Sequence, residues 1–580
     1  MPVYLKIPLR FRPALIDALK DYSGKKFLAD LGAGITVGIV AIPLAMAFAI
    51  ASGVDPRAGM VTAIVAGFLI SALGGSRYQI GGPTGAFVPI LAAIVATAGQ
   101  NNLLLCTFMA GIILVVMGMA GLGKIIQYIP YPVTMGFTSG IAVIIFTGEI
   151  KDFLGLPIDH LDADFMSKVM QYLDYLGQTN VPALLIGLLV VLIVVYWPTQ
   201  WQRWLPGSMV GLIVASLMVK YGHLHVLTIG DSYPIAPGQG FPPFHLPELR
   251  LREIPVLFNS AMTIAMLGAI ESLLSAVVAD GLTNDRHDSN QELLAQGIAN
   301  IVSPMFGGIA ATGAIARTGT NIRRGAVTPV AGMIHALTLL IILLVAGSLA
   351  NAIPMCALAG ILLVVSFKMG GWHEFVRLRR IPRSDALVFL TVFGLTVLID
   401  LSTAVRWGIV LAALLFVKRV SEATEITALD EAHPPTGGRP IWADESWPDG
   451  VYLFRVQGAF FFGTADILET SFLRAGAKLR VMVLLCEDVL TIDATGLNAL
   501  ENLHERLQQR KSHLVLCKVS RQPLEAITQS GFLDELGPDN LTKTIDDALQ
   551  RSRALLYSPA EGNKKQRALR DKRERFDGGD

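Results

Sequence analysis

The sequence predicts an all-α polytopic membrane protein that is followed by a small α/β domain. Hydrophobic residues make up 52% of the chain and charged residues 16%, whereas ordinary soluble proteins carry about 25% charged residues. Apolar runs of the length that a membrane helix needs, about 20 residues, recur between Leu28 and Val417. After Val420 the hydropathy falls, and short β-rich runs alternate with helical patterns.

The spans are clearest where charges are absent. Residues 103–120 and 181–197 each fit one span, whereas residues 326–367 contain no Asp, Glu, Lys or Arg and are long enough for two. We expect the chain to turn back within this last stretch at residues 351–354. No cleavable signal peptide is expected, because the first apolar run contains Asp30 and continues into further spans.

Lysines and arginines between the spans predict the orientation, because cytoplasmic loops are enriched in them. Basic residues crowd the first 26 residues and the segments 368–383 and 418–419, whereas the loop 151–180 is rich in aspartate. Both termini are therefore expected in the cytoplasm, which requires an even number of spans.

Hydropathy and composition divide the chain into five parts. We expect a cytoplasmic N-terminal segment (1–26), a transmembrane domain (27–420), a Pro/Gly-rich linker (421–450), an α/β domain (451–558) and a disordered charged tail (559–580). The four cysteines have no metal-like or redox-like spacing, so we interpret them as packing residues and expect no metal site.

Two glycine-rich breaks, residues 74–90 and 303–325, interrupt apolar segments in different halves of the chain. Paired interruptions of this kind are typical of discontinuous helices whose N-termini meet near the membrane midplane, where free amides and positive dipole ends attract an anion. The second break carries one cation, Arg317, after a long uncharged stretch. The predicted anion-binding residues are Thr84, Gly85, Ala86, Gly313, Ala314, Ile315 and Arg317. The alternative is that these glycines only permit close helix packing.

Glu271 lies in the middle of the apolar stretch 260–282, where an acid is seldom without function. At helical spacing Glu271 and Ser275 share a face, so the pair is a candidate for binding a cation or a proton. The alternative is a structural ion pair between Glu271 and Arg317. His335 is interpreted as a hydrogen-bonded packing residue.

Five stretches of the chain resemble the SulP family of anion transporters. They are Asp30 to Gly53, Gly74 to Phe87, Ile129 to Ile145, Met266 to Asp280, and Asn300 to Ala326. Within the family the chain is most similar to the bacterial branch of C4-dicarboxylate transporters that includes DauA, especially at Met266 to Ala326 and Glu149 to Leu156.

The resemblance implies fourteen transmembrane helices in two inverted seven-helix repeats, which form a core and a gate that move against each other. It places the anion between two half-helices that begin near Thr84 and Ala314, with Phe48 lining the pocket. Glu271 matches an acid that helps to bind sodium in bicarbonate-carrying relatives. Leu44, Ala314 and Ile315 depart from the family pattern, which favours proton coupling through Glu271 over sodium.

The second domain resembles a STAS domain, on the strength of IDATG at Ile492 to Gly496. Ala494 occupies the position of the serine that related anti-sigma-factor antagonists phosphorylate, so a phosphoswitch at that position is excluded, although Thr495 keeps a hydroxyl.

The predicted function is proton-coupled uptake of C4-dicarboxylates such as succinate, fumarate or aspartate, by a secondary active transporter in a bacterial inner membrane. The alternatives are transport of bicarbonate or sulfate, with or without sodium coupling, and an uncoupled anion channel or exchanger. No nucleophile, metal cluster or cofactor loop suggests an enzyme, so the only expected ligands are the anion and a co-transported proton or sodium ion. The resemblance also implies a homodimer in the lipid bilayer, with the STAS domain in the cytoplasm and no nucleic-acid partner.

Overall fold

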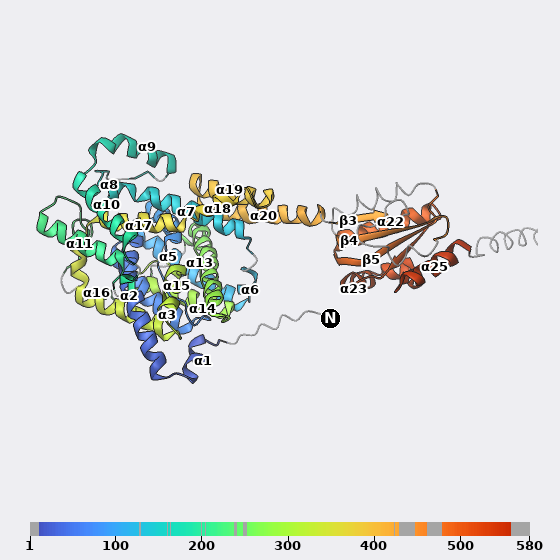
Figure 1. The fold of residues 1–580 in the computed structure, drawn as a ribbon, viewed down its shortest axis with the longest axis horizontal. Coiled ribbons are helices and arrows are strands. Elements are labelled where there is room, and N and C mark those ends of the chain that lie inside the picture. Colours follow the sequence, from blue (N-terminus) through green and yellow to red (C-terminus); the bar gives the residue numbers. More distant parts are fainter. Residues whose placement is uncertain are drawn as a thin grey trace, which may run out of the picture. The chain divides into compact units, whose positions relative to one another are not determined.

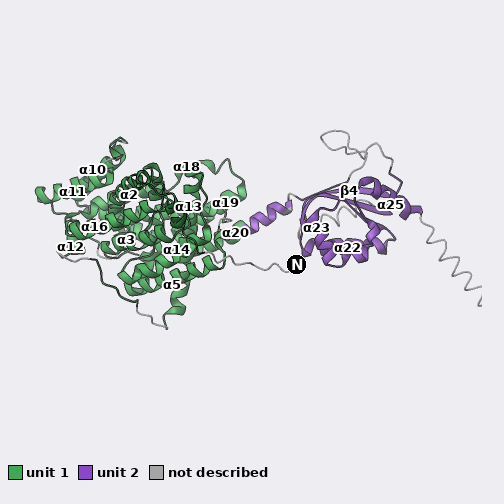
Figure 2. Cartoon of the chain, turned by 90° about the horizontal axis from the view of Figure 1, so that it is seen from below, with its two compact units in different colours: residues 1–412 green, residues 413–580 purple. Residues whose placement is uncertain are grey.

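The chain forms two compact units, which divide after Ala412 (Figure 2). A computed structural model describes residues 11–126, 129–158, 161–162, 164–198, 200–203, 205–236, 241–247, 252–422, 424–428, 447–460 and 478–557. The predicted tail 559–580, most of the predicted linker and the first ten residues lie outside this range.

The first unit is a bundle of helices from both halves of the sequence (Figure 1). By length and composition, eight of the described helices can cross a membrane, or nine if the bent pair Phe165–Gln178 and Val181–Tyr196 is one span. The helices before the midpoint are α1 (Ala14–Lys20), α2 (Gly24–Ala51), α3 (Pro56–Leu73), α4 (Val88–Ala98), α5 (Gln100–Met119), α6 (Gly123–Ile126), α7 (Tyr131–Gly148), α8 (Ile150–Leu154), α9 (Phe165–Tyr175), α10 (Val181–Tyr196), α11 (Gly207–Gly222) and α12 (Ile229–Ser232). Those after it are α13 (Ile254–Thr283), α14 (Ser289–Val302), α15 (Ile315–Arg323), α16 (Val330–Ala346), α17 (Met355–Met369), α18 (Trp372–Arg377), α19 (Arg383–Leu398) and α20 (Leu401–Glu422).

Helix packing follows the predicted internal repeat. Seven helices of the first half (α2, α3, α4, α5, α7, α10 and α11) correspond in order to seven of the second (α13, α14, α15, α16, α17, α19 and α20). The contact of α2 with α16 is matched by that of α13 with α5, and the contact of α7 with α19 by that of α17 with α10. The polytopic helical fold class is therefore confirmed, and the turn predicted at residues 351–354 separates α16 from α17.

A two-stranded sheet joins the two halves where their helices are broken. Strand β1 (Gly81–Gly82) pairs antiparallel with β2 (Thr312–Gly313). After β1 the chain continues into a short 3-10 helix, η1 (Gly85–Phe87), and α4, and after β2 it continues into α15. Extended backbone inside a membrane needs internal hydrogen-bond partners, and the two strands supply them to each other.

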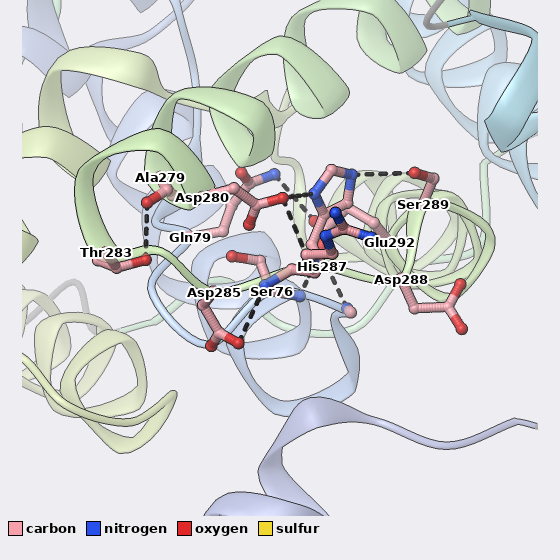
Figure 3. A network of polar contacts seen from close by, with 12 residues as sticks. Ser76, Gln79, Ala279, Asp280, Thr283, Asp285, His287, Asp288, Ser289 and Glu292 are labelled. Atoms are coloured by element: carbon pink, nitrogen blue, oxygen red, sulfur yellow. Dashed lines mark hydrogen bonds and ion pairs between the residues drawn. The ribbon is translucent and has the colours of Figure 1, made fainter.

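Two buried carboxylates hold the loops next to this crossing. Glu292 on α14 accepts hydrogen bonds from the backbone N–H groups of Gly75 (3.0 Å) and Ser76 (3.2 Å) and from the side-chain amide of Gln79 (2.9 Å), as Figure 3 shows in part. Asp30 on α2 accepts from the backbone N–H groups of residues 327 (2.7 Å) and 328 (3.1 Å). Each carboxylate therefore binds a loop from the opposite half of the chain.

The second unit is an α/β domain built on a five-stranded sheet in the order β3-β4-β5-β6-β7. Only β3 runs antiparallel to its neighbour; the other pairs are parallel. The strands are β3 (Glu425–Ala428), β4 (Val451–Phe460), β5 (Val481–Ile492), β6 (His513–Cys517) and β7 (Leu541–Thr542), and the helices are α22 (Ala494–Gln509), α23 (Arg521–Gln529), α24 (Phe532–Leu536) and α25 (Ile545–Tyr557). Buried residues line both faces of the sheet. The predicted α/β class is confirmed.

The predicted linker 421–450 begins too early. Helix α20 continues to Glu422, and residues 425–428 form the edge strand β3 of the sheet. Four residues that include a glutamate give too weak a pattern to predict a strand from hydropathy alone.

We expect Glu292→Ala to lower the midpoint of thermal unfolding of the purified protein by several degrees. The substitution leaves the part-buried Gly75 amide and the buried Ser76 amide without an acceptor, at a cost of up to roughly 1–3 kcal/mol for each. The control is Asp174→Ala, which changes an exposed acid. Equal midpoints for the two variants would show that Glu292 does not hold the loop in place.

Candidate functional site

Two helix N-termini meet at the strand crossing. Helix η1 begins at Gly85 after the extended residue Thr84, and α15 begins at Ile315 after the extended residue Ala314. The first amides of a helix have no acceptor within it, so both ends present N–H groups. The Thr84 hydroxyl is also buried, and within the described structure it has no hydrogen-bond partner. These donors form the positive end of two helix dipoles at one place.

One of the predicted amide donors is not available. The Ala314 N–H donates to the carbonyl oxygen of Ile80 (2.9 Å), because Ala314 directly follows β2 and continues its pairing with the first break. The donors at this helix end therefore begin at Ile315, whose side chain is exposed. The amides of Gly85 and Ala86 at the other end stay as predicted candidates.

Arg317 lies in the first turn of α15 and is 3% exposed. Its Nη2 donates to the carbonyl oxygen of Pro83 in the opposite break. Its Nη1 has no partner, and no described carboxylate forms an ion pair with it. A buried charge without a counter-charge is strongly unfavourable, so the guanidinium is suited to an anion that arrives from outside the protein.

Gly82 makes room for this guanidinium. Its φ of +148° lies in a region that favours glycine, and a Cβ atom added to it would lie 2.5 Å from Nη1 of Arg317. Gly313 makes room for a different group, since an added Cβ would lie 2.2 Å from the Gln79 side-chain nitrogen. The contact explains why glycine stands at 313, and the role of Gly313 in anion binding stays a prediction.

Phe48 and Ile145 lie next to the N-terminus of η1. A Cβ atom added to Gly85 would lie 3.2 Å from the Phe48 ring and 3.0 Å from Ile145 Cδ1. Phe48 comes from α2, as the resemblance implied, and Ile145 comes from α7. Sequence reasoning missed Ile145, because one isoleucine in an apolar span carries no distinguishing signal.

Ser275 does not pair with Glu271. The Ser275 hydroxyl donates to Thr318 Oγ1 (3.1 Å), which also accepts the Ile80 amide (3.1 Å). Three positions earlier on α13, the Ser272 and Thr312 hydroxyls are 2.7 Å apart. Both hydroxyls on α13 therefore bind the second broken segment, and Thr318 connects that segment to Ile80 of the first. Sequence reasoning singled out Ser275 and missed the other residues of this network.

The Glu271 carboxylate makes no hydrogen bond or ion pair within the described part of the chain. The alternative interpretation, an ion pair with Arg317, is therefore not seen. Glu271 lies on α13, one helical turn from the Ser275 hydroxyl that joins this helix to the site.

His335 was expected to be hydrogen-bonded, and this expectation is wrong. The residue is fully buried on α16, and neither ring nitrogen has a partner in the described structure. Its ring faces Gly67 on α3, where an added Cβ would lie 3.6 Å from the His335 Cε1 atom. Glycine offers the imidazole space without offering a side-chain acceptor.

Fold and site together define a polytopic membrane protein of the inverted-repeat class, in which two broken helices meet at a buried cation. The chain belongs to the Sulfate permease family, whose model matches residues 27–392, and residues 447–548 match the STAS domain.

Relatives match nearly the whole chain. It is 42% identical over 533 residues to YvdB of Bacillus subtilis, named as a sulfate transporter, with 91% of this chain and 98% of YvdB covered. It is 31% identical over 538 residues to the bicarbonate transporter BicA of Synechocystis, with 90% and 94% covered. The murine Solute Carrier 26 member A9 structure has the same fold, at a TM-score of 0.81 and 18% identity over 93% of this chain and 94% of that one. These relatives do not support the predicted likeness to the dicarboxylate branch.

We expect Gly82→Ala to weaken anion binding at least about tenfold, because the added methyl group displaces the Arg317 guanidinium. The measurement is the rise in unfolding temperature that sulfate or bicarbonate produces in the purified protein. Gly281→Ala on α13 is the matched control, since a Cβ there meets no atom within 4 Å. An unchanged rise in Gly82→Ala would place the anion away from Arg317.

Proposed function

We propose that this protein is a secondary active transporter of small inorganic anions, with sulfate and bicarbonate as the first candidates. The observation that carries the proposal is Arg317, a buried guanidinium with one unpartnered nitrogen beside two helix N-termini. Each helix N-terminus acts as about half a positive charge. The site therefore attracts an anion without any bound cofactor.

The choice of substrate rests on the relatives and on charge. YvdB and BicA, which align with nearly all of this chain, are named for sulfate and for bicarbonate. Among the described residues, Arg317 is the one buried lysine or arginine. A C4-dicarboxylate carries two separate carboxylates, whereas Arg317 has a single guanidinium nitrogen, Nη1, that is buried and unpartnered among the described residues. A compact anion suits the site better, so dicarboxylate uptake becomes the second candidate.

Alternating access is the mechanism that we propose. The pocket lies between Phe48 of α2 and Ile145 of α7, and these helices belong to different packing groups: α2 packs on α3 and α16, whereas α7 packs on α17 and α19. Movement of one group against the other would expose Arg317 to one side of the membrane at a time. We assign coupling to Glu271, through a proton or a sodium ion, because its carboxylate has no partner of its own among the described residues.

The membrane setting follows the distribution of basic residues. We place the protein in the cytoplasmic membrane of a bacterium, with the N-terminus and the STAS domain in the cytoplasm. A homodimer is the assembly that we propose.

The direct test is uptake of labelled sulfate, bicarbonate and succinate into proteoliposomes, with imposed proton or sodium gradients. We expect uptake of sulfate or bicarbonate, reduced about 10- to 100-fold in Arg317→Ala, since a hydrogen bond to a charged group contributes roughly 1.5–3 kcal/mol. Arg317→Lys should retain part of the activity, because it keeps the charge but not the planar fork.

Glu271→Gln separates coupling from binding. We expect this variant to exchange anions across the membrane but to lose accumulation driven by the cation gradient. Accumulation of succinate that neither sulfate nor bicarbonate inhibits would overturn the substrate assignment. Gradient-driven accumulation that persists in Glu271→Gln would overturn the coupling role.

A further inference from the structure

Two acidic residues, Glu149 and Asp152, lie at the C-terminal end of α7. The loop 151–180 that follows is predicted to lie outside the cell. Glu149 follows α7 directly, and Asp152 lies three residues further on in α8. The backbone stays helical through Glu149, so the two carboxylates lie on the same side of the chain. Glu149 is 7% exposed.

Neither carboxylate has a side-chain partner among the described residues. Four acids are buried in the described structure. Asp30 and Glu292 bind backbone amides, and Glu374 binds Tyr131 and Arg377. The fourth, Glu149, makes no side-chain hydrogen bond or ion pair with any described residue, and the same holds for Asp152 and for the neighbouring Lys151. A carboxylate out of water without a partner is costly, so an additional positive charge is expected here.

Tyr172 on α9 packs against the segment that follows the two acids. The residue is 5% exposed and packs with Leu156 and Ile158 of the segment that follows α8. Its hydroxyl is buried without a partner among the described residues. Ile150, which lies between the two acids in the sequence, packs against the same cluster as Tyr172. A phenol oxygen is therefore available close to the segment that carries the two carboxylates.

A small cavity adjoins Asp152. It has a volume of about 40 Å³ and is lined by Asp152, Asn180, Leu227, Met355 and Cys356, among others. This volume is sufficient for at least one water molecule. Water in the cavity can complete the coordination of an ion that the protein oxygens hold on one side only.

The charges of the described residues nearby do not neutralise the two acids. Among these residues, Lys151 is the one cation that acts on Asp152, and Tyr172, Tyr233 and Cys356 are the titratable groups of neighbouring elements in its field. With both acids ionised the group carries one net negative charge. The C-terminal ends of α7 and α8 add negative dipole potential, which makes the position unfavourable for acids unless they bind a cation.

We propose that Glu149, Asp152 and Tyr172 form a binding site for one small cation, a proton or Na⁺, at the outward end of α7. The site is separate from Glu271, which lies on α13. It is close to the anion pocket, because the Glu149 amide bonds to the carbonyl oxygen of Ile145 (3.1 Å), and Ile145 lies next to Gly85 at that pocket. A cation bound one helical turn away raises the positive potential that an entering anion meets.

Two measurements on the full chain in lipid nanodiscs test the proposal and distinguish the two cations. Binding of labelled Na⁺ at pH 8 reports sodium, and the infrared band of a protonated carboxyl group, compared between pH 5.5 and pH 8, reports a proton. In Glu149→Gln we expect either the amount of bound Na⁺ or the protonated-carboxyl band to be lower than in the unmodified protein, by the amount that one site per chain contributes. The same signal should be unchanged in Asp174→Asn, which alters an exposed acid on the helix of Tyr172.

Tyr172→Phe is the second variant, and it removes one oxygen without changing charge. We expect it to weaken Na⁺ binding several-fold, or to shift the carboxyl band, at an unchanged unfolding temperature; it keeps the test open if Glu149→Gln does not fold. The proposal is overturned if both signals stay at the level of the unmodified protein in both variants. It is also overturned if Glu271→Gln alone removes every cation signal.

Discussion

The rest of the structure depends on one constraint: backbone that leaves a helix inside a membrane must find its hydrogen bonds within the protein. Here the two broken segments satisfy each other through β1 and β2. That pairing turns two helix N-termini toward one place and brings Arg317 of one segment to the Pro83 carbonyl of the other. The anion site is therefore a result of how the breaks are stabilised.

Four acids of the helical unit, Asp30, Glu149, Glu271 and Glu292, fall into two groups that differ in what surrounds them. Asp30 and Glu292 each accept hydrogen bonds from two backbone amides, so their charge holds loops in place. Glu149 and Glu271 lack such partners within the described residues, and their charge is available to something mobile. A carboxylate that accepts several N–H donors thus holds a loop in place. A carboxylate without such donors is available to bind a mobile cation or a proton.

Much of the fold could be predicted from the sequence, because hydropathy, glycine-rich breaks and isolated charges are local signals. They located the spans, both broken helices and Arg317. The pairings could not be predicted, since they join residues far apart: Ile80 binds Thr318 across 238 positions. For the same reason the sequence did not reveal that the Ala314 amide is already bonded, or that Ser275 pairs with Thr318. The expectation of a hydrogen bond to His335 was wrong, because neither ring nitrogen has a partner among the described residues. The short strand β3 was missed because four residues give almost no periodic signal.

The two loop-holding carboxylates also have a consequence for how the chain is made. Asp30 is synthesised 297 positions before Val327, whose amide donates to it. Gly75 is synthesised 217 positions before Glu292, which accepts its amide. At a synthesis rate of about 5–20 residues per second, roughly 15–60 s pass between the synthesis of Asp30 and that of the amides at 327 and 328 that donate to it. During that interval Tyr22 is the one described residue of the first half whose side chain donates a hydrogen bond to Asp30 (3.2 Å), so the first helices acquire their final anchoring only when the second half has been made.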